Sequence, residues 1–184
     1  MSHSILTASL KSAANSSLDA GNPMLFLDQL ESIHQNWHQR TFNARRLGFL
    51  VFHWTVVEAF KRAKCPSVWN GGIRPFRPKD FTGFGWSYNV TIRAANKDID
   101  SLADFSLAIE SWHNDAHMAV GNAFGIANDM MDPRVNIYHR EFWRLHYFIN
   151  TKFLRELRRY DSTGSATKKI EQLEADQHMN LHRI

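Results

Sequence analysis

The hydrophobic and polar positions of the chain follow a helical period in four segments. Residues 25–40, 100–118 and 135–159 place apolar side chains three and four positions apart, which gathers them on one face of an α-helix. Residues 47–63, "LGFLVFHWTVVEAFKRA", are apolar nearly all round, so a helix there must be buried on every side. The pattern therefore predicts four main helices around one core.

The segments outside these helices have a different composition. Residues 1–22 are rich in Ser, Ala and Asn and predict a flexible N-terminal arm or a marginal first helix, and residues 161–184 predict a polar C-terminal tail. Residues 64–100 combine prolines, glycines and aromatic residues, which predicts a long irregular loop of the kind that often carries function. The expected fold is all-α, a four-helix bundle with little strand, and its domain spans residues 23–160.

Composition and charge narrow the class of protein. Of the 184 residues 43% are apolar, which is enough for one folded domain with a substantial core. The net charge of +4 is small and comes from charges of both signs along the chain, so no nucleic-acid partner is expected. No apolar run reaches the length of a membrane span, and no membrane partner is expected. One cysteine and a start unlike a signal peptide lead us to expect a cytoplasmic location.

Two histidine pairs lie in the predicted helices. His34 and His38 in "LESIHQNWHQR", and His113 and His117 in "AIESWHNDAHMAVG", are four positions apart, so each pair lies on one helix face and can reach one ion. Both pairs follow the sequence Glu-Ser-apolar, and the first histidine of each stands on the apolar side of its helix, beside a tryptophan. A buried imidazole needs partners for both nitrogens, so the pairs predict two metal half-sites.

Each pair is followed by a further histidine in an apolar segment. His53 lies in the second predicted helix and His139 lies in the fourth. The resulting sets are His34, His38 and His53 in the first half and His113, His117 and His139 in the second half. Together they predict a binuclear metal site in the bundle, whereas His146 is interpreted as a residue that packs between helices.

Two kinds of binuclear centre are compatible with these residues. In the first, Glu31 with His34 and Glu110 with His113 match the Glu-x-x-His motif of di-iron carboxylate bundles. Glu58 and Glu141 would supply the additional carboxylates of such a centre. In the second, six imidazoles without a carboxylate hold a pair of copper ions.

The residues around the second set follow a specific order. The run is His113-Asn114-x-x-His117-x-x-x-Gly121, then Asp132-Pro133, Tyr138-His139 and Arg144-Leu145. This order resembles the second copper motif of the tyrosinase and catechol oxidase family, which reads His-Asn-x-x-His, then Asp-Pro-x-Phe-x-x-His-His and Arg-Leu-Trp. His139 corresponds to the ligand of the His-His pair in this resemblance.

The first set resembles the family less closely. The sequence "FLVFHW" around His53 is similar to the family's Phe-Leu-Pro-Trp-His-Arg. The position of the family's second ligand of the first copper is occupied by Ala44. His34 and His38 are therefore assigned by their helical spacing, which resembles the arrangement in hemocyanins.

The resemblance implies a short type-3 binuclear copper protein with a tyrosinase-like domain. It implies a copper-dependent phenol oxidase that uses dioxygen to oxidise o-diphenols to o-quinones, with ortho-hydroxylation of monophenols as a second reaction. Asn114 is implied as the catalytic residue that helps to deprotonate the phenol through a water held by an acid, for which Asp98 and Asp100 are candidates. Met118 is implied as the residue that faces the substrate.

The cofactor and partners expected from this resemblance are two copper ions, dioxygen and a phenolic small molecule, with a copper-delivery protein as a further candidate. Two alternatives remain open. One is a dioxygen-binding protein or biosynthetic oxygenase of the same copper type. The other is the di-iron carboxylate bundle.

Overall fold

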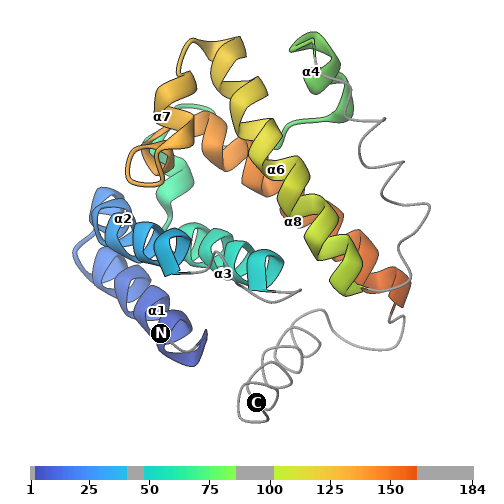
Figure 1. The fold of residues 1–184 in the computed structure, drawn as a ribbon. Helices are drawn as coiled ribbons and strands as arrows, with labels where there is room; N and C mark the ends of the chain where they lie inside the picture. The colour runs from blue at the N-terminus through green and yellow to red at the C-terminus, as the bar shows by residue number, and fades with distance from the viewer. Residues whose placement is uncertain (1–2, 41–47, 86–101, 161–184) are drawn as a thin grey trace.

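The computed structural model describes residues 3–40, 48–85 and 102–160, which form helices and connecting turns without a strand (Figure 1). The α-helices are α1 (His3–Asp19), α2 (Pro23–Arg40), α3 (Gly48–Arg62), α4 (Pro78–Gly83), α6 (Leu102–Phe124), α7 (Ala127–Met131) and α8 (Arg140–Tyr160). Two short 3-10 helices, η1 (Cys65–Val68) and η2 (Asn136–Tyr138), lie between them. The predicted all-α class is confirmed. Within this part of the chain, no helix has the length and apolar character needed to cross a membrane.

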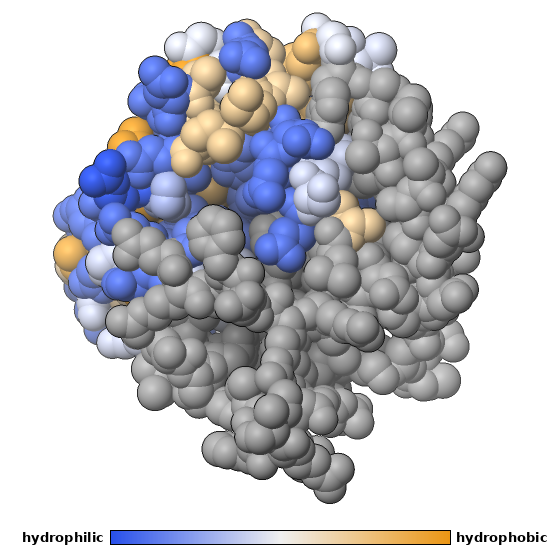
Figure 2. Space-filling view, in the orientation of Figure 1, coloured by the Kyte–Doolittle hydropathy of each residue, from blue (hydrophilic) through white to orange (hydrophobic). Residues whose placement is uncertain are grey.

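The four predicted helices correspond to α2, α3, α6 and α8. Helix α3 packs against α6 and α8, which also pack against each other, as Figure 1 shows. Large aromatic side chains join them, with the rings of Phe60 and Trp143 stacked at a centroid distance of 3.6 Å. The ring of Trp37 from α2 stacks on Phe52 of α3 at 4.1 Å. The described surface in Figure 2 is mostly hydrophilic, as expected when the apolar faces of the helices are turned inward.

Of the two alternatives for the N-terminal segment, the structure contains the helix, because residues 3–19 form α1. Its buried side chains Leu10, Ala13, Ala14 and Ser17 recur at helical spacing and pack against α2 and α3. The small alanine side chains allow close packing between helices. The hydroxyl of Ser17 donates to the carbonyl oxygen of Asn22 at 2.7 Å, which fixes the turn into α2.

The predicted loop contains two short helices, η1 and α4, in its described part. The backbone N–H of Phe76 donates to the carbonyl oxygen of Arg144 at 3.1 Å, which attaches this segment to α8. The buried ring of Phe81 contacts the rings of Trp112 and Phe148, so α4 covers the α6–α8 interface. Residues 86–100 of the predicted loop and the predicted tail at 161–184 lie outside the described residues.

Candidate metal centre

Six histidine side chains meet in the interior between α2, α3, α6 and α8. They are His34 and His38 from α2, His53 from α3, His113 and His117 from α6, and His146 from α8. All except His38 are at most 5% exposed, and His38 is partly exposed. Polar side chains are rarely buried this completely without a partner or a ligand. The cluster is therefore the candidate functional site of the molecule.

The first three histidines form one group on α2 and α3. The Nε2 atoms of His34 and His38 lie 3.1 Å apart. Ligand atoms of these two residues and of His53 all lie within 4.8 Å of one another. This geometry agrees with the i, i+4 spacing, which puts both imidazoles of α2 on the side that faces α3.

The second group lies on α6 and α8. The Nε2 atoms of His113 and His117 each lie 3.3 Å from Nε2 of His146. The two groups meet at His53, whose ring stacks on that of His146 with a centroid distance of 4.6 Å. Ligand atoms of His53, His113 and His146 also lie within 4.8 Å of one another. The two groups of candidate ligands therefore share His53, and His117 adjoins the second group through Nε2 of His146.

The structure does not bring His139 into this cluster, although the sequence motif assigned it as a ligand. His139 has an extended backbone (φ −94°, ψ 133°) and precedes the first residue of α8. Its Nε2 lies 3.0 Å from a carboxylate oxygen of Asp129, and its side chain is 26% exposed. The physical reason is the start of α8 at Arg140, which leaves His139 outside the helix whose inner face reaches the cluster.

His146 takes the position that was expected for His139. It lies on the strongly apolar face of α8 together with Phe142, Ile149 and Phe153, all of them buried. These residues are separated by four, three and four positions, which is the spacing of one helix face. The spacing of residues 142–153 indicates that His146 shares their buried face, but the start of α8, which leaves His139 outside the helix, was not visible in the sequence.

Two main-chain carbonyl groups hold histidines of the cluster. The Nδ1–H of His34 donates to the carbonyl oxygen of Pro133 at 2.7 Å, and the Nδ1–H of His117 donates to that of Met130 at 2.6 Å. A carbonyl oxygen only accepts, so each ring carries its proton on Nδ1 and presents the Nε2 lone pair to the cluster. Such hydrogen bonds commonly orient histidines that bind metals.

The environment of the cluster favours neutral imidazoles. Burial, reinforced by neighbouring histidines, lowers the pKa of His34, His113 and His146 well below the ordinary value. Burial also lowers the pKa of His38 and of His117 to about 4. Near pH 7 these rings are uncharged and have a lone pair available for a ligand.

An aromatic wall surrounds the histidines. The ring of Phe142 lies 4.0 Å from that of His146, 5.4 Å from that of His34 and 5.8 Å from that of His117, measured between centroids. On the α2–α3 side, the ring of Trp37 lies 5.0 Å from His38. These rings shield the cluster from water on its inner side, and the partly exposed His38 marks the side nearer to solvent.

The other predicted site residues lie at or near the surface. Asn114 is exposed, with Oδ1 3.3 Å from Nδ1 of His113, and Met118 is 48% exposed. Glu31 accepts a hydrogen bond from the hydroxyl of Tyr138 at 3.2 Å, and the pKa of the half-buried Glu110 is raised by burial. The candidate metal-binding groups among the described residues contain histidine alone. The candidate acids Asp98 and Asp100 lie outside the described part of the chain.

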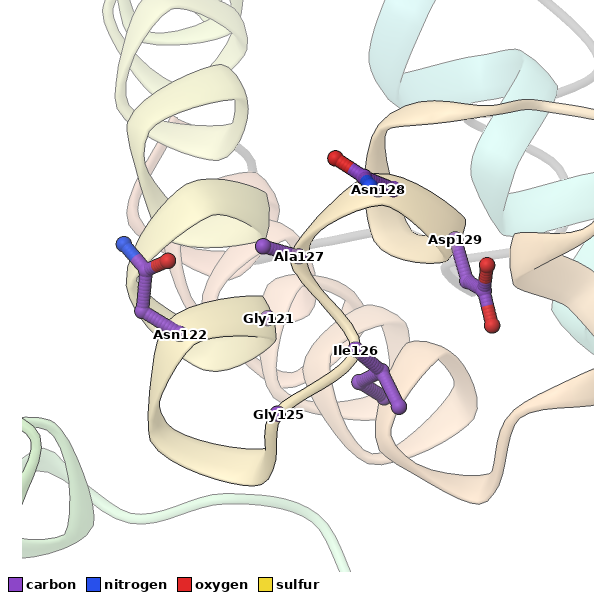
Figure 3. A pocket seen from close by; sticks show the side chains of 7 residues that line it. All are labelled: Gly121, Asn122, Gly125, Ile126, Ala127, Asn128 and Asp129. Atoms are coloured by element: carbon purple, nitrogen blue, oxygen red, sulfur yellow. The ribbon is translucent and has the colours of Figure 1, made fainter.

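A cavity of about 330 Å³ lies near the end of α6. Figure 3 shows its lining, which comes from the last turns of α6, the connection at Gly125 and Ile126, and α7. No histidine of the cluster lines this cavity. Because its lining contains no candidate ligand of the cluster, we do not assign this cavity to the metal centre.

The chain was compared with protein-family models, with curated proteins and with solved structures. None of the three comparisons finds a match.

Proposed function

We propose that the histidine cluster holds two copper ions and that the protein is a type-3 copper oxidoreductase. In this proposal α2, α3, α6 and α8 form a four-helix bundle around a binuclear centre. The proposed reaction is the oxidation of an o-diphenol to the o-quinone by dioxygen. The observation that carries the proposal is the convergence of six buried or partly buried imidazoles from these four helices.

The distances between ring nitrogens fit a shared ion. Two imidazole nitrogens bound to one first-row metal ion at about 2.0–2.1 Å are about 3.3 Å apart when the geometry is close to tetrahedral. The observed Nε2 separations are 3.1 Å between His34 and His38, and 3.3 Å from His146 to His113 and to His117. These three pairs of nitrogens therefore have a spacing that suits two ligands of one ion.

The hydrogen bonding of the cluster also favours a ligand. Within the described residues, Nδ1 of the buried His146 has no hydrogen-bond partner. The Nε2 atom of His146 faces the Nε2 atoms of His113 and His117. Nε2 of His117 offers a lone pair, because the ring proton of His117 is on Nδ1. One ring proton on His146 cannot satisfy both neighbours at once. A bound cation would accept all three lone pairs and would offset the cost of burying these rings.

The donor set favours copper over iron. Imidazole nitrogen suits copper, whereas di-iron bundles rely mainly on carboxylates that project into the core. Glu31 and Glu110 are not members of the candidate groups, and Glu58 forms a surface ion pair with Lys61 at 2.7 Å. The di-iron alternative lacks carboxylate ligands among the described residues, so we favour the copper centre.

The side chains have distinct parts in the proposed reaction. His34, His38 and His53 would hold one ion, and His113, His117 and His146 would hold the other. When bound, the copper pair would supply dioxygen activation and a two-electron oxidant. The balanced reaction converts two o-diphenols and one dioxygen to two o-quinones and two waters, so each diphenol gives up two electrons and two protons.

The protein controls access and water. Phe142 and the other rings of the wall exclude water from the inner side of the cluster. The partly exposed His38 indicates that a planar phenol would approach from that edge. Asn114 and Met118 are exposed on α6, next to His113 and His117, and we propose that they contact this substrate.

The proposal is tested by loading purified protein with copper, removing loosely bound ions and measuring both metal content and catechol oxidation. We expect two coppers per chain and formation of the o-quinone with uptake of dioxygen. Copper bound without quinone formation would contradict the enzymatic part of the proposal and would favour dioxygen binding alone. Failure to retain copper, or retention of two irons instead, would refute the copper centre.

Two variants separate the copper centre from the di-iron centre. His53→Ala should lower the copper content and abolish catechol oxidation, because it removes a ligand from the core of the cluster. Glu110→Gln keeps a side chain of the same size and should retain both coppers. Loss of metal in Glu110→Gln with retention in His53→Ala would be the result expected of a carboxylate centre.

A further inference from the structure

The segment that runs from the end of α7 into the turn before η2 contacts both halves of the histidine cluster. The carbonyl oxygen of Met130 accepts from His117, which belongs to the α6–α8 set. The carbonyl oxygen of Pro133, three positions later, accepts from His34, which belongs to the α2–α3 set. One short segment thus supplies the outer hydrogen-bond partner for a histidine of each set.

This turn is held by hydrogen bonds of its own. The carbonyl oxygen of Asp132 accepts the backbone N–H groups of Val135 and Asn136, at 3.0 and 2.9 Å. The Asp132 carboxylate accepts the backbone N–H of Arg134 at 2.9 Å and pairs with its guanidinium group at 2.7 Å. The carbonyl groups of Met130 and Pro133 therefore belong to one ordered unit.

Neighbouring side chains attach the same unit to the bundle. The buried amide of Asn136 donates to the carbonyl oxygen of Met130 at 3.4 Å. The hydroxyl of Tyr138 donates to a carboxylate oxygen of Asp28 on α2 at 3.0 Å. The indole N–H of Trp143 on α8 donates to the carbonyl oxygen of Ile137 at 2.7 Å. The unit is consequently fixed to α2, which carries histidines of the first set, and to α8, which carries His146 of the second set.

Gly121 brings the unit close to α6. It lies one turn beyond His117, and a Cβ atom at this position would lie 2.7 Å from Cα of Ala127 in α7. Real Cβ atoms essentially never come so close to backbone, so only glycine permits this approach. The approach of α7 to α6 lets the carbonyl group of Met130 reach the ring of His117.

We infer that residues 130–133 form a shared brace that sets the ring orientation and the protonated nitrogen of one histidine in each half-site. The inference rests on the proposed function for its link to metal binding. Loss of outer hydrogen-bond partners typically lowers metal affinity about 10- to 100-fold. Because both carbonyl groups belong to one unit, displacement of the brace should weaken both half-sites together, whereas loss of a ligand weakens one.

The first part of the test uses metal-free protein and ¹⁵N NMR of the histidine rings. We expect the rings of His34 and His117 to carry their protons on Nδ1. Gly121→Ala should shift the ring nitrogen resonances of both residues. Gly83→Ala, where a Cβ atom meets nothing within 4 Å, is the matched control and should shift neither. A proton on Nε2 of either ring would overturn the inference.

The second part measures copper affinity in half-sites isolated by mutation. His113→Ala removes a ligand of the α6–α8 set and keeps the α2–α3 set intact. His38→Ala removes a ligand of the α2–α3 set and keeps the α6–α8 set intact. In both backgrounds, Gly121→Ala should lower the affinity for copper about tenfold or more, and Gly83→Ala should leave it unchanged. A loss confined to the His38→Ala background would overturn the shared brace, because it would restrict the effect to the half-site of His117.

A second variant keeps the test decisive if Gly121→Ala does not fold. Asp132→Ala removes the carboxylate that holds the turn at the surface, and Glu58→Ala, which removes a surface ion pair elsewhere, is its control. Asp132→Ala should lower the copper affinity in both the His113→Ala and the His38→Ala background, and Glu58→Ala should lower it in neither. If wild-type protein binds no copper, the proposed function fails, and the ring resonances of the metal-free protein still decide the brace.

Discussion

Acidification should unfold the metal-free protein, because the buried histidines must remain neutral in the fold. His117 is 5% exposed, and its pKa is lowered by burial from 6.5 to about 4. The unfolded chain binds a proton at this residue near pH 6.5, whereas the folded chain binds it only near pH 4. Stability is therefore fully present above pH 6.5 and falls as the pH decreases from 6.5 towards 4.

The magnitude follows from the two pKa values. At pH 5.5 the contribution of His117 is a loss of about 1.4 kcal/mol, and the loss approaches about 3.4 kcal/mol below pH 4. His38, with a pKa of about 4, contributes in the same direction and range. A domain of this size is typically stable by about 5–15 kcal/mol, so these two residues alone remove a large part of its stability.

The assay is urea unfolding in the presence of a chelator at several pH values between 7.5 and 4.5. The free energy of unfolding should fall with decreasing pH, and the fall should be smaller in His117→Gln by up to about 1.4 kcal/mol per pH unit. A stability that stays constant from pH 7 to pH 5, or an equal pH dependence in His117→Gln, would refute this account of the cluster.

Three further predictions concern the cluster and its surroundings. His146→Ala should reduce bound copper from two ions to one per chain, whereas His139→Ala should retain both; metal analysis showing the reverse would restore the assignment made from the sequence motif. Phe142→Ala should lower the free energy of unfolding by about 3–5 kcal/mol, because it empties a fully buried site, and a loss below about 1 kcal/mol in urea unfolding would contradict the packing described. Tyr138→Phe should cost about 0.5–1.5 kcal/mol in the same assay, because it removes the hydroxyl that donates to Asp28, and Asp28→Ala in the Tyr138→Phe background should then cost little more.

The sequence determined the helices and most of the cluster because both depend on local periodicity. Apolar spacing predicted the four main helices, and the structure contains them as α2, α3, α6 and α8. The i, i+4 pairs placed His34 with His38 and His113 with His117 on common faces, and the structure brings all four into the interior together with His53. A helical face is set by residues within a few turns, so a single sequence is enough to show it.

Tertiary structure decided which further histidine joins the second set and what holds the rings. The motif favoured His139, but the start of α8 at Arg140 leaves that residue beside Asp129 and directs His146 to the cluster. The carbonyl groups of Met130 and Pro133 reach histidines of different helices, and contacts between distant segments leave no periodic signal in the sequence. The packing of α1 has the same origin, because its weakly apolar face is buried by the helices that it meets. Local periodicity thus fixed which faces carry imidazoles, and long-range packing fixed which of those imidazoles meet.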